Sequence, residues 1–319
     1  MTRALRVAVA GASGIGRHHA NWHAQVGGEV VAILGSRPDR CRKTRDQLRE
    51  TFGFGGRSYT DLTELLQAEA PDVVDVCTPN EMHYDCVARS LAAGSHVLCE
   101  KPLVWDTALS ADRLRAQARE LCDLARDCGR HLGLCTQYAF AVDHYRRVEP
   151  GTDPERATRF EAELETLARG SRRNAATVWI DMGSHPLSLI LAVMPRGEVD
   201  GSSLRARFRG REAEAEFTLR QDGRTCHCRV VVRDRDEGPP VRRFGFDGRM
   251  ADFLGRPGED GLYRAVLTAG GREDVARDYM HRLIGQFHDA VAGRAESPLV
   301  PAEVAVRNLD LQLRILEAA

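Results

Sequence analysis

The sequence predicts an α/β protein: an N-terminal Rossmann-type doubly wound parallel sheet, then a C-terminal α+β domain on a largely antiparallel open sheet. Three observations predict this fold. Short apolar segments alternate with amphipathic ones over residues 1–136, a glycine-rich turn follows the first apolar segment, and apolar and polar residues alternate strictly in several segments after residue 138. We expect domains at 1–136 and 137–319, and the closing helices can pack back on the first domain.

The composition excludes several classes of protein. The 319 residues are 43% hydrophobic, enough for two cores. A formal net charge of -1 gives no general basis for binding nucleic acid or an anionic membrane. No apolar run reaches the length of a membrane span, and the starting segment MTRALRVAVAG predicts a strand rather than a signal peptide. We expect a cytoplasmic protein.

The cysteines predict neither disulfides nor a metal site. There are nine, which is an odd number, and no pair has C-x-x-C spacing, as expected in a reducing compartment. Cys226 and Cys228 form a single C-x-C pair. Their side chains would share one face of a strand, so packing explains them better than metal binding.

Five segments of the first domain predict strands that are buried on both faces, because they are rich in Val, Leu and Ile and alternate little. They are residues 6–10, 29–34, 73–77, 96–99 and 131–136. Helical segments lie between them. One begins after Asp61, and another runs from about 81 to 93 and ends at Gly94.

The second domain begins with alternating segments. In residues 160–166, Phe160, Ala162 and Leu164 share one face, and SLRARF, EAEFTL and 225–232 alternate in the same way. Residues 221–223, Gln-Asp-Gly, predict a hairpin turn. Two helices, at about 278–292 and 301–318, close the chain.

The turn after the first strand predicts a pyrophosphate site. Its residues are Gly11, Ala12, Ser13, Gly14, Ile15 and Gly16. Glycines let the backbone approach a phosphate closely, and the next helix offers free N–H groups. Ser13 replaces the usual middle glycine, which a small residue can tolerate. A tight turn without a ligand is the alternative.

The end of the second strand predicts which nucleotide binds. NAD-binding proteins normally carry an acidic residue here for the ribose hydroxyls, but this strand ends Leu34-Gly35-Ser36-Arg37-Pro38, with no acid before Asp39. A serine and an arginine suit a 2′-phosphate. We therefore expect NADP(H) to be preferred, with NAD(H) possible. The alternative is that Arg37 lies over the adenine or in solvent.

Two further strand ends place polar residues at the nicotinamide side of the sheet, since ligands of such sheets bind beyond the carboxyl ends of strands. Lys101 can hydrogen-bond a substrate oxygen or exchange a proton there, and the following proline favours an extended backbone. Asn80 can equally be a helix cap. The residues that we expect to contact the cofactor here are Thr78, Pro79, Asn80, His83, Glu100 and Lys101.

A second candidate set lies in the segment VWIDMGSHPLSLI, where Asp181 and His185 are four residues apart. On one helix this spacing puts both on the same face. A carboxylate that orients an imidazole makes it a better general base. Such pairs are also common for structural reasons alone.

The segments GASGIGRHHA, DVVDVCTPNEMHYDCVARSLAAGSHVLCEKPL and DMGSHPLSLI resemble the glucose–fructose oxidoreductase/inositol dehydrogenase/MocA family. The resemblance implies a Rossmann domain, a second domain whose open sheet makes dimer or tetramer contacts, and Lys101, Asp181 and His185 as the catalytic set. The chain departs from the family at residues 136–140, at 174–179 and at Ser188, all near the implied substrate pocket.

These inferences predict an NADP(H)-dependent oxidoreductase of a small polar alcohol or ketone, such as a sugar, cyclitol or biosynthetic intermediate. His185 would exchange the proton, Lys101 would polarise the oxygen, and Asp181 would orient His185. We expect Tyr138, Trp179 and Asn174 to line the substrate site, although Trp179 could be a core residue. The alternatives are an imine reductase, a nicotinamide-assisted hydrolase or lyase, and a non-catalytic NADP-binding protein.

Overall fold

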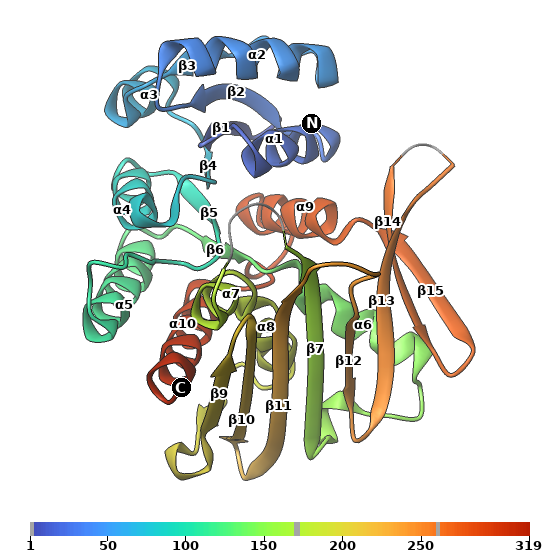
Figure 1. Ribbon diagram of the computed structural model, residues 1–319. Coiled ribbons are helices and arrows are strands. Elements are labelled where there is room, and N and C mark those ends of the chain that lie inside the picture. Colours follow the sequence, from blue (N-terminus) through green and yellow to red (C-terminus); the bar gives the residue numbers. More distant parts are fainter. Residues whose placement is uncertain (1–2, 169–172, 260–261) are drawn as a thin grey trace. The chain divides into compact units, whose positions relative to one another are not determined.

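The computed structural model describes residues 3–168, 173–259 and 262–319 (Figure 1). The chain divides into two compact units. The first comprises Met1–Cys135 and Met280–Val306, and the second comprises Thr136–Tyr279 and Arg307–Ala319. Residues 280–306 thus return to the unit in which the chain begins.

The first unit is built on a six-stranded parallel sheet with the order β3-β2-β1-β4-β5-β6. This order confirms the predicted Rossmann sheet, with its switch point between β1 and β4. All five predicted strands are present, and β3 is additional; its three residues begin with an arginine and carry no apolar run. The strands are β1 (Arg6–Ala10), β2 (Glu29–Leu34), β3 (Arg57–Tyr59), β4 (Val73–Val76), β5 (His96–Glu100) and β6 (Leu132–Cys135).

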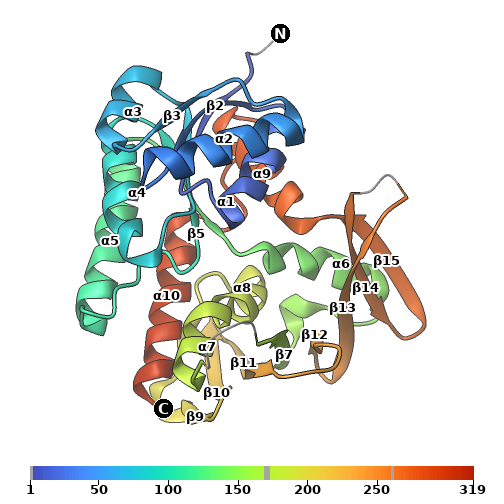
Figure 2. The same cartoon turned by 45° about the horizontal axis from the view of Figure 1, so that its top comes forward.

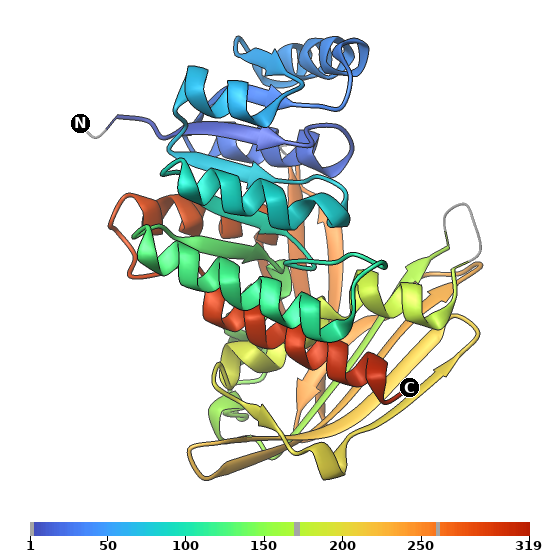
Figure 3. The ribbon, with the colours of Figure 1, turned by 90° about the vertical axis from the view of Figure 1, so that its left-hand side faces the viewer.

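Helices cover both faces of this sheet. On one face α1 packs beside α2, and on the other α3, α4 and α5 follow one another (Figure 3). α9 belongs to the first face, because His288 of α9 contacts His23 of α1. The bounds are α1 (Ile15–Gln25), α2 (Pro38–Phe52), α3 (Leu62–Glu69), α4 (His83–Ala92), α5 (Ala111–Asp127) and α9 (Tyr279–Val291).

The second unit is built on a nine-stranded, largely antiparallel sheet, as predicted. Its order is β15-β14-β13-β12-β7-β11-β10-β8, with β9 paired to β10, and only β7 and β11 run parallel. Asp222 and Gly223 have φ of 50° and 77° in the predicted hairpin turn. The strands are β7 (Arg159–Leu167), β8 (Glu198–Val199), β9 (Arg205–Arg209), β10 (Glu212–Gln221), β11 (Arg224–Arg235), β12 (Arg242–Phe246), β13 (Arg249–Pro257), β14 (Tyr263–Ala269) and β15 (Arg272–Arg277).

Helices cover one face of the second sheet. α6 (Ala141–Val148) packs on β14 and β15, α7 (Ala175–Met182) on β10 and β11, and α8 (Ser184–Val193) on β7 (Figure 2). α10 (Ala302–Glu317) ends the chain. Among the described residues, no single helix is long and apolar enough to cross a membrane; α7 and α8 pass that test only as a pair bent by 44°.

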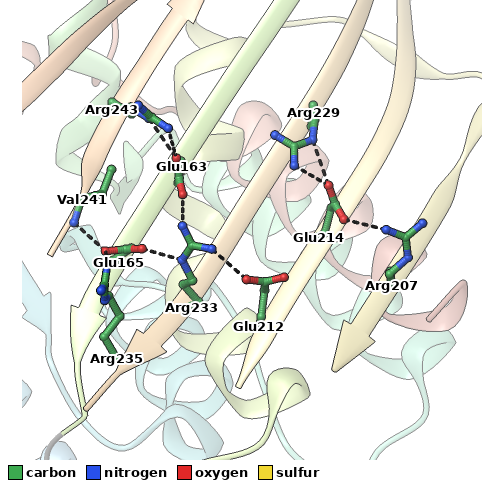
Figure 4. A network of polar contacts seen from close by, with 10 residues as sticks. All are labelled: Glu163, Glu165, Arg207, Glu212, Glu214, Arg229, Arg233, Arg235, Val241 and Arg243. Carbon is green, nitrogen blue, oxygen red and sulfur yellow. Dashed lines mark hydrogen bonds and ion pairs between the residues drawn. The ribbon is translucent and has the colours of Figure 1, made fainter. Parts of the chain in front are cut away.

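The other face of the second sheet carries rows of paired charges (Figure 4). Arg233 contacts three carboxylates from two neighbouring strands, those of Glu163, Glu165 and Glu212. Burial raises the pKa of Glu165, but the Val241 N–H and two arginines outweigh it and hold that pKa below its usual value. The sheet that we expect to join copies of the chain therefore has its charges paired within one copy.

Candidate active site

The glycine turn has the geometry that a pyrophosphate needs. Gly11 and Gly14 have φ of 82° and 65°, in the region that favours glycine. A Cβ on Gly11 would lie 2.4 Å from the Cys77 oxygen, and one on Gly16 would lie 2.4 Å from the Gly11 oxygen. Gly14 caps α1 without any side-chain hydrogen bond to the helix. The N–H of Arg17 donates to the Gly14 oxygen at 3.3 Å, so the N–H groups of Ile15 and Gly16 are the ones that can face an anion, and the chain fits a dinucleotide here.

The carboxyl end of β2 presents the two residues predicted to select NADP(H). Ser36 and Arg37 are both exposed, and Arg37 is the residue before the first turn of α2. Its Nε lies 3.5 Å from Asp39 Oδ1, and both side chains are well exposed. Because an exposed pair this long contributes little, the guanidinium can turn to a phosphate.

His83 connects the two strand ends that carry the other predicted cofactor residues. Its ring is fully buried. Nδ1 lies 2.8 Å from the Pro102 oxygen and Nε2 lies 3.0 Å from the Thr78 oxygen. Burial lowers the pKa of His83, and the two carbonyls only partly oppose it. His83 therefore holds the backbone on either side of the predicted nicotinamide position, rather than presenting its ring there. Pro79 and Asn80 follow Thr78 after β4, and Asn80 begins a short 3-10 turn.

Lys101 follows directly after β5 and is half-buried. Its backbone N–H lies 3.3 Å from Glu100 Oε2, and the peptide bond to Pro102 is cis. Lysine occurs at only two positions, Lys43 and Lys101, whereas the other 43 of the 45 basic residues are arginine. Lys43 is exposed on α2. One of the two lysines therefore stands at a strand end of the sheet. Its amine, unlike a guanidinium, can lose a proton.

A buried polar cluster that the sequence did not reveal lies beneath this edge. His19 and His23 are one turn apart on α1, and both contact Asp75 Oδ2 of β4 at 2.8 Å. His23 Nδ1 lies 2.8 Å from His288 Nε2, and His19 Nε2 lies 3.2 Å from Glu100 Oε1. The cluster links α1, β4, β5 and α9. Its signal in the sequence was the i, i+4 pair of histidines facing the sheet.

The protonation of the cluster follows from its burial and charges. Burial raises the pKa of Asp75, but His19 and His23 outweigh it and hold that pKa below its usual value. Burial lowers the pKa of His19, but Cys77 and Asp75 outweigh it and raise that pKa well above 6.5. Burial lowers the pKa of His288 to about 3. Asp75 at Nδ1 therefore favours the charged form of His19, whose Nε2 faces Glu100.

Metal-ligand atoms come together in the same cluster, where His19, Asp75 and Cys77 each offer one. The same nitrogen, His19 Nδ1, lies 2.8 Å from Asp75 Oδ2 and 3.3 Å from Cys77 Sγ. Burial raises the pKa of the Cys77 thiol well above its usual value, whereas a metal ligand must be a thiolate. We therefore interpret these contacts as hydrogen bonds.

In the second unit, Asp181 and His185 lie on two helices rather than on one. Asp181 is the last residue but one of α7 and His185 is the second residue of α8, and the two helices are bent by 44°. Pro186 explains the bend, because its ring has no N–H and conflicts with the preceding turn. A Cβ on Gly183 would lie 2.7 Å from the Trp179 oxygen. The prediction that Asp181 and His185 lie on one continuous helix is therefore wrong.

Tyr138 lies beside His185. Their ring centroids are 5.2 Å apart, and Tyr138 also contacts the ring of Phe253 at 5.1 Å. Burial raises the pKa of Tyr138 to about 12, so the ring acts as a neutral aromatic wall. The structure thus brings together one predicted substrate residue and one predicted catalytic residue.

The other two predicted substrate residues have structural partners. Trp179 is fully buried, and its Nε1–H donates to the Gln312 oxygen at 3.0 Å. This placement favours the alternative in which Trp179 is a core residue. Asn174 caps α7, where its Oδ1 accepts from the Thr177 N–H at 2.9 Å.

Arg173 contacts the predicted site residue Asp181, and the sequence analysis missed this contact. Its Nη1 lies 2.6 Å from Asp181 Oδ2, and its Nε and Nη2 lie 2.7 and 2.5 Å from the two oxygens of Asp234. Burial lowers the pKa of Arg173, but the hydrogen bond to Asp234, the largest influence, and the one to Asp181 raise it overall. An arginine next to an Arg-rich tract carries no signal of its own in the sequence.

Known proteins resemble both units. Residues 5–132 match the family model described as the oxidoreductase family with an NAD-binding Rossmann fold. D-glucoside 3-dehydrogenase of Escherichia coli is 32% identical over 206 residues, which cover 60% of this chain and 54% of that protein. The match therefore spans about half the length of that relative.

Two solved structures share the fold over nearly the whole chain. An inositol dehydrogenase homolog from Azotobacter vinelandii, complexed with NADH and myo-inositol, has a TM-score of 0.73 and 18% identity, covering 100% of this chain and 96% of that one. The 3-ketoreductase KijD10 from Actinomadura kijaniata, in complex with NADP and TDP-benzene, has a TM-score of 0.71 and 21% identity, covering 99% and 98%.

Proposed function

Because the chain belongs to the GFO/IDH/MocA family of oxidoreductases with an NAD-binding Rossmann fold, we propose that it is an NADP(H)-dependent oxidoreductase. It would interconvert a secondary alcohol and a ketone on a sugar or cyclitol. D-glucosides and myo-inositol, named for the similar proteins, are the first compounds to test. Bound nicotinamide would supply or take the hydride.

The residues of the first unit would hold the cofactor. The open N–H groups of α1 and the backbone of Gly11–Gly16 would bind the pyrophosphate. Ser36 and Arg37 would bind the 2′-phosphate. Neighbouring strand ends, at Thr78 and Lys101, would form the wall beside the nicotinamide, with their backbones held by His83.

The observation that carries the proposal is the lysine at the end of β5. In a chain with only two lysines, one stands at the carboxyl edge of a dinucleotide-binding sheet. Its amine can hydrogen-bond the substrate oxygen as the carbon changes between alcohol and ketone. His185 would take the hydroxyl proton or return it. Asp181 would stabilise the imidazolium, and Tyr138 would hold the ring face of His185.

The experiment compares His185→Ala and Lys101→Ala with the parent on a panel of glucosides and inositols. His185→Ala should reduce kcat roughly 10²–10⁴-fold, the usual contribution of a general acid or base, while the Kd for NADPH stays within about twofold. The combined variant should lose less than the product of the two single losses. His227→Ala is the matched control, since His227 is an exposed histidine on β11. If His185→Ala keeps most of the activity, the mechanism is wrong.

The nine-stranded sheet of the second unit carries the proposed contact between copies of the chain. A homodimer or homotetramer through its charged face would have to bury ion pairs that are already formed within each copy. Light scattering at low and high salt would give the oligomeric state and its dependence on these charges.

A further inference from the structure

We propose that His19 is a positioning residue for Lys101 and that it acts through the carboxylate of Glu100. The inference rests on the proposed function, in which the amine of Lys101 hydrogen-bonds the substrate oxygen. All three residues belong to the first unit. His19 lies on α1, Glu100 is the last residue of β5, and Lys101 follows it directly.

The two oxygens of the Glu100 carboxylate contact different parts of this unit. The backbone N–H of Lys101 donates to Oε2 at 3.3 Å, and Oε1 lies 3.2 Å from His19 Nε2. The Glu100 side chain is 15% exposed and that of His19 is fully buried. Water screens the attraction between charges only weakly in such a place. The carboxylate therefore connects the residue after β5 to α1.

The His19 ring is held from its other side by Asp75. Nδ1 lies 2.8 Å from Asp75 Oδ2 and 3.3 Å from Cys77 Sγ, and Cys135 Sγ lies within 4.8 Å of the facing atoms of His19 and Glu100. Burial raises the pKa of both thiols well above its usual value, so the charged neighbours of the ring are the two carboxylates. Only the protonated ring has an N–H on both nitrogens. Nε2 then faces Glu100 as an ion pair rather than as an aligned hydrogen bond.

The backbone around Lys101 is held on both sides. Glu100 accepts the Lys101 N–H, and His83 Nδ1 lies 2.8 Å from the oxygen of the next residue, Pro102. The point from which the flexible lysine side chain starts therefore depends on where Glu100 lies. A shift of about 1 Å in a reacting group can reduce turnover about 10²-fold. A residue that fixes Glu100 thus affects catalysis without touching the substrate.

His23 provides a matched control on the same helix. It is also fully buried, and its Nε2 lies 2.8 Å from the same Asp75 oxygen. Among the residues that the structure describes, the polar contacts of its side chain are with Asp75 and His288. A change at either histidine removes a buried contact with Asp75, but only a change at His19 also removes the contact with Glu100. A purely structural role predicts similar effects of the two changes, whereas positioning predicts different ones.

The test measures His19→Gln in two backgrounds, the parent and Lys101→Ala, on the same polyol panel. Glutamine is neutral and has both donors on one nitrogen, so it cannot replace the ring between Asp75 and Glu100. In the parent, kcat should fall roughly 10–100-fold, while KM stays within about threefold and the Kd for NADPH within about twofold. In Lys101→Ala the same change should lower kcat less than about threefold, because no amine is left to position.

His23→Gln should keep kcat within about threefold of the parent, because glutamine can still donate to Asp75. Glu100→Gln serves if His19→Gln does not fold. It keeps the volume of the side chain and an oxygen for the Lys101 N–H, but it removes the charge that faces His19. It should lower kcat roughly 10-fold in the parent and less than about threefold in Lys101→Ala. Circular dichroism verifies the fold of each variant.

Three results would overturn the inference. The first is a parental kcat in His19→Gln while Lys101→Ala is impaired. The second is an equal fold-loss from His19→Gln in the two backgrounds, and the third is a loss in His23→Gln as large as that in His19→Gln. Either of the last two would make the cluster purely structural. In all three, the proposed function stands. Retention of activity by both His185→Ala and Lys101→Ala would instead remove the proposed function itself.

Discussion

His23 Nε2 lies 2.8 Å from Asp75 Oδ2, and both side chains are fully buried. The same oxygen accepts from His19, and the other ring nitrogen of His23 contacts His288. A carboxylate buried away from water needs such donors, since its desolvation is costly. The packing of α1 and α9 on the first sheet therefore depends on the protonation of histidines.

We predict that the first unit loses stability on acidification because of His288. Burial lowers the pKa of His288 from 6.5 to about 3, and His23 and Arg294 act in the same direction while Asp75 opposes them. Below pH 6.5, His288 binds a proton in the unfolded chain but not in the folded chain. The free energy of unfolding therefore falls as the pH falls from 6.5 towards 3. Between pH 6.5 and about pH 4, the free energy of unfolding should decrease by about 3 kcal/mol.

His288→Gln should flatten this pH dependence, because glutamine can still hydrogen-bond His23 and does not titrate. The measurement is the free energy of unfolding from urea titrations at several pH values. His227→Gln, which changes an exposed histidine on β11, is the control. His96 will leave a residual slope of the same sign, because burial lowers its pKa to about 4. An unchanged slope in His288→Gln would contradict the prediction.

We predict that NADPH binds at least roughly fivefold more tightly than NADH, since a 2′-phosphate gains charge-assisted hydrogen bonds from Ser36 and Arg37. Arg37→Ala should weaken the binding of NADPH alone, which reduces the difference between the dissociation constants of NADPH and NADH. Fluorescence titration gives both dissociation constants. Arg49→Ala is the matched control, as Arg49 lies in the last turn of α2. Equal affinities in the parent protein would show that the arginine does not select the cofactor.

We predict that arginine cannot replace the lysine after β5. Lys101→Arg keeps the positive charge, but the guanidinium is planar, larger and unable to lose a proton. Turnover should fall roughly 10²-fold or more, close to the loss in Lys101→Ala. Lys43→Arg should be neutral, and it leaves Lys101 as the only lysine. An amine-selective reagent should then inactivate the Lys43→Arg protein and be slowed by NADPH. Full activity of Lys101→Arg would mean that only the charge matters.

The sequence predicted the first sheet well, because buried parallel strands are short apolar runs with glycine and proline at their ends. The edge strand β3 was missed since Arg57–Tyr59 has too few residues for a period. The break between α7 and α8 was missed for another reason. The spacing of Asp181 and His185 is that of one helix, and the effect of Pro186 depends on how the following turn packs.

The candidate site was predicted where the residue type carries its own chemistry, as for the glycine turn and Lys101. Pairings between distant residues could not be predicted. Asp75 and His288 are 213 positions apart in the cluster around His23, and Arg173 meets Asp234 across 61 positions. Such contacts depend on register and tertiary packing, which a single sequence does not encode in any local pattern.

We predict that the two aromatic residues proposed for the substrate site behave differently. Trp179 is fully buried and donates to the Gln312 oxygen, and Gln312 in turn donates to the Trp179 and Ile180 oxygens. Trp179→Phe removes one of these bonds and part of the ring, so it should cost about 1–3 kcal/mol of stability. Its KM and substrate preference should not change.

Tyr138 is the matched comparison, because its ring contacts His185 directly. Tyr138→Leu removes the aromatic wall and frees His185 to adopt other orientations, so kcat should fall and the ranking of substrates should change. Thermal unfolding and steady-state kinetics on the same polyol panel separate the two effects. If Trp179→Phe raises KM without changing stability, Trp179 lines the substrate site as first predicted. Unaltered kinetics in Tyr138→Leu would mean that the 5.2 Å ring contact only packs the second unit.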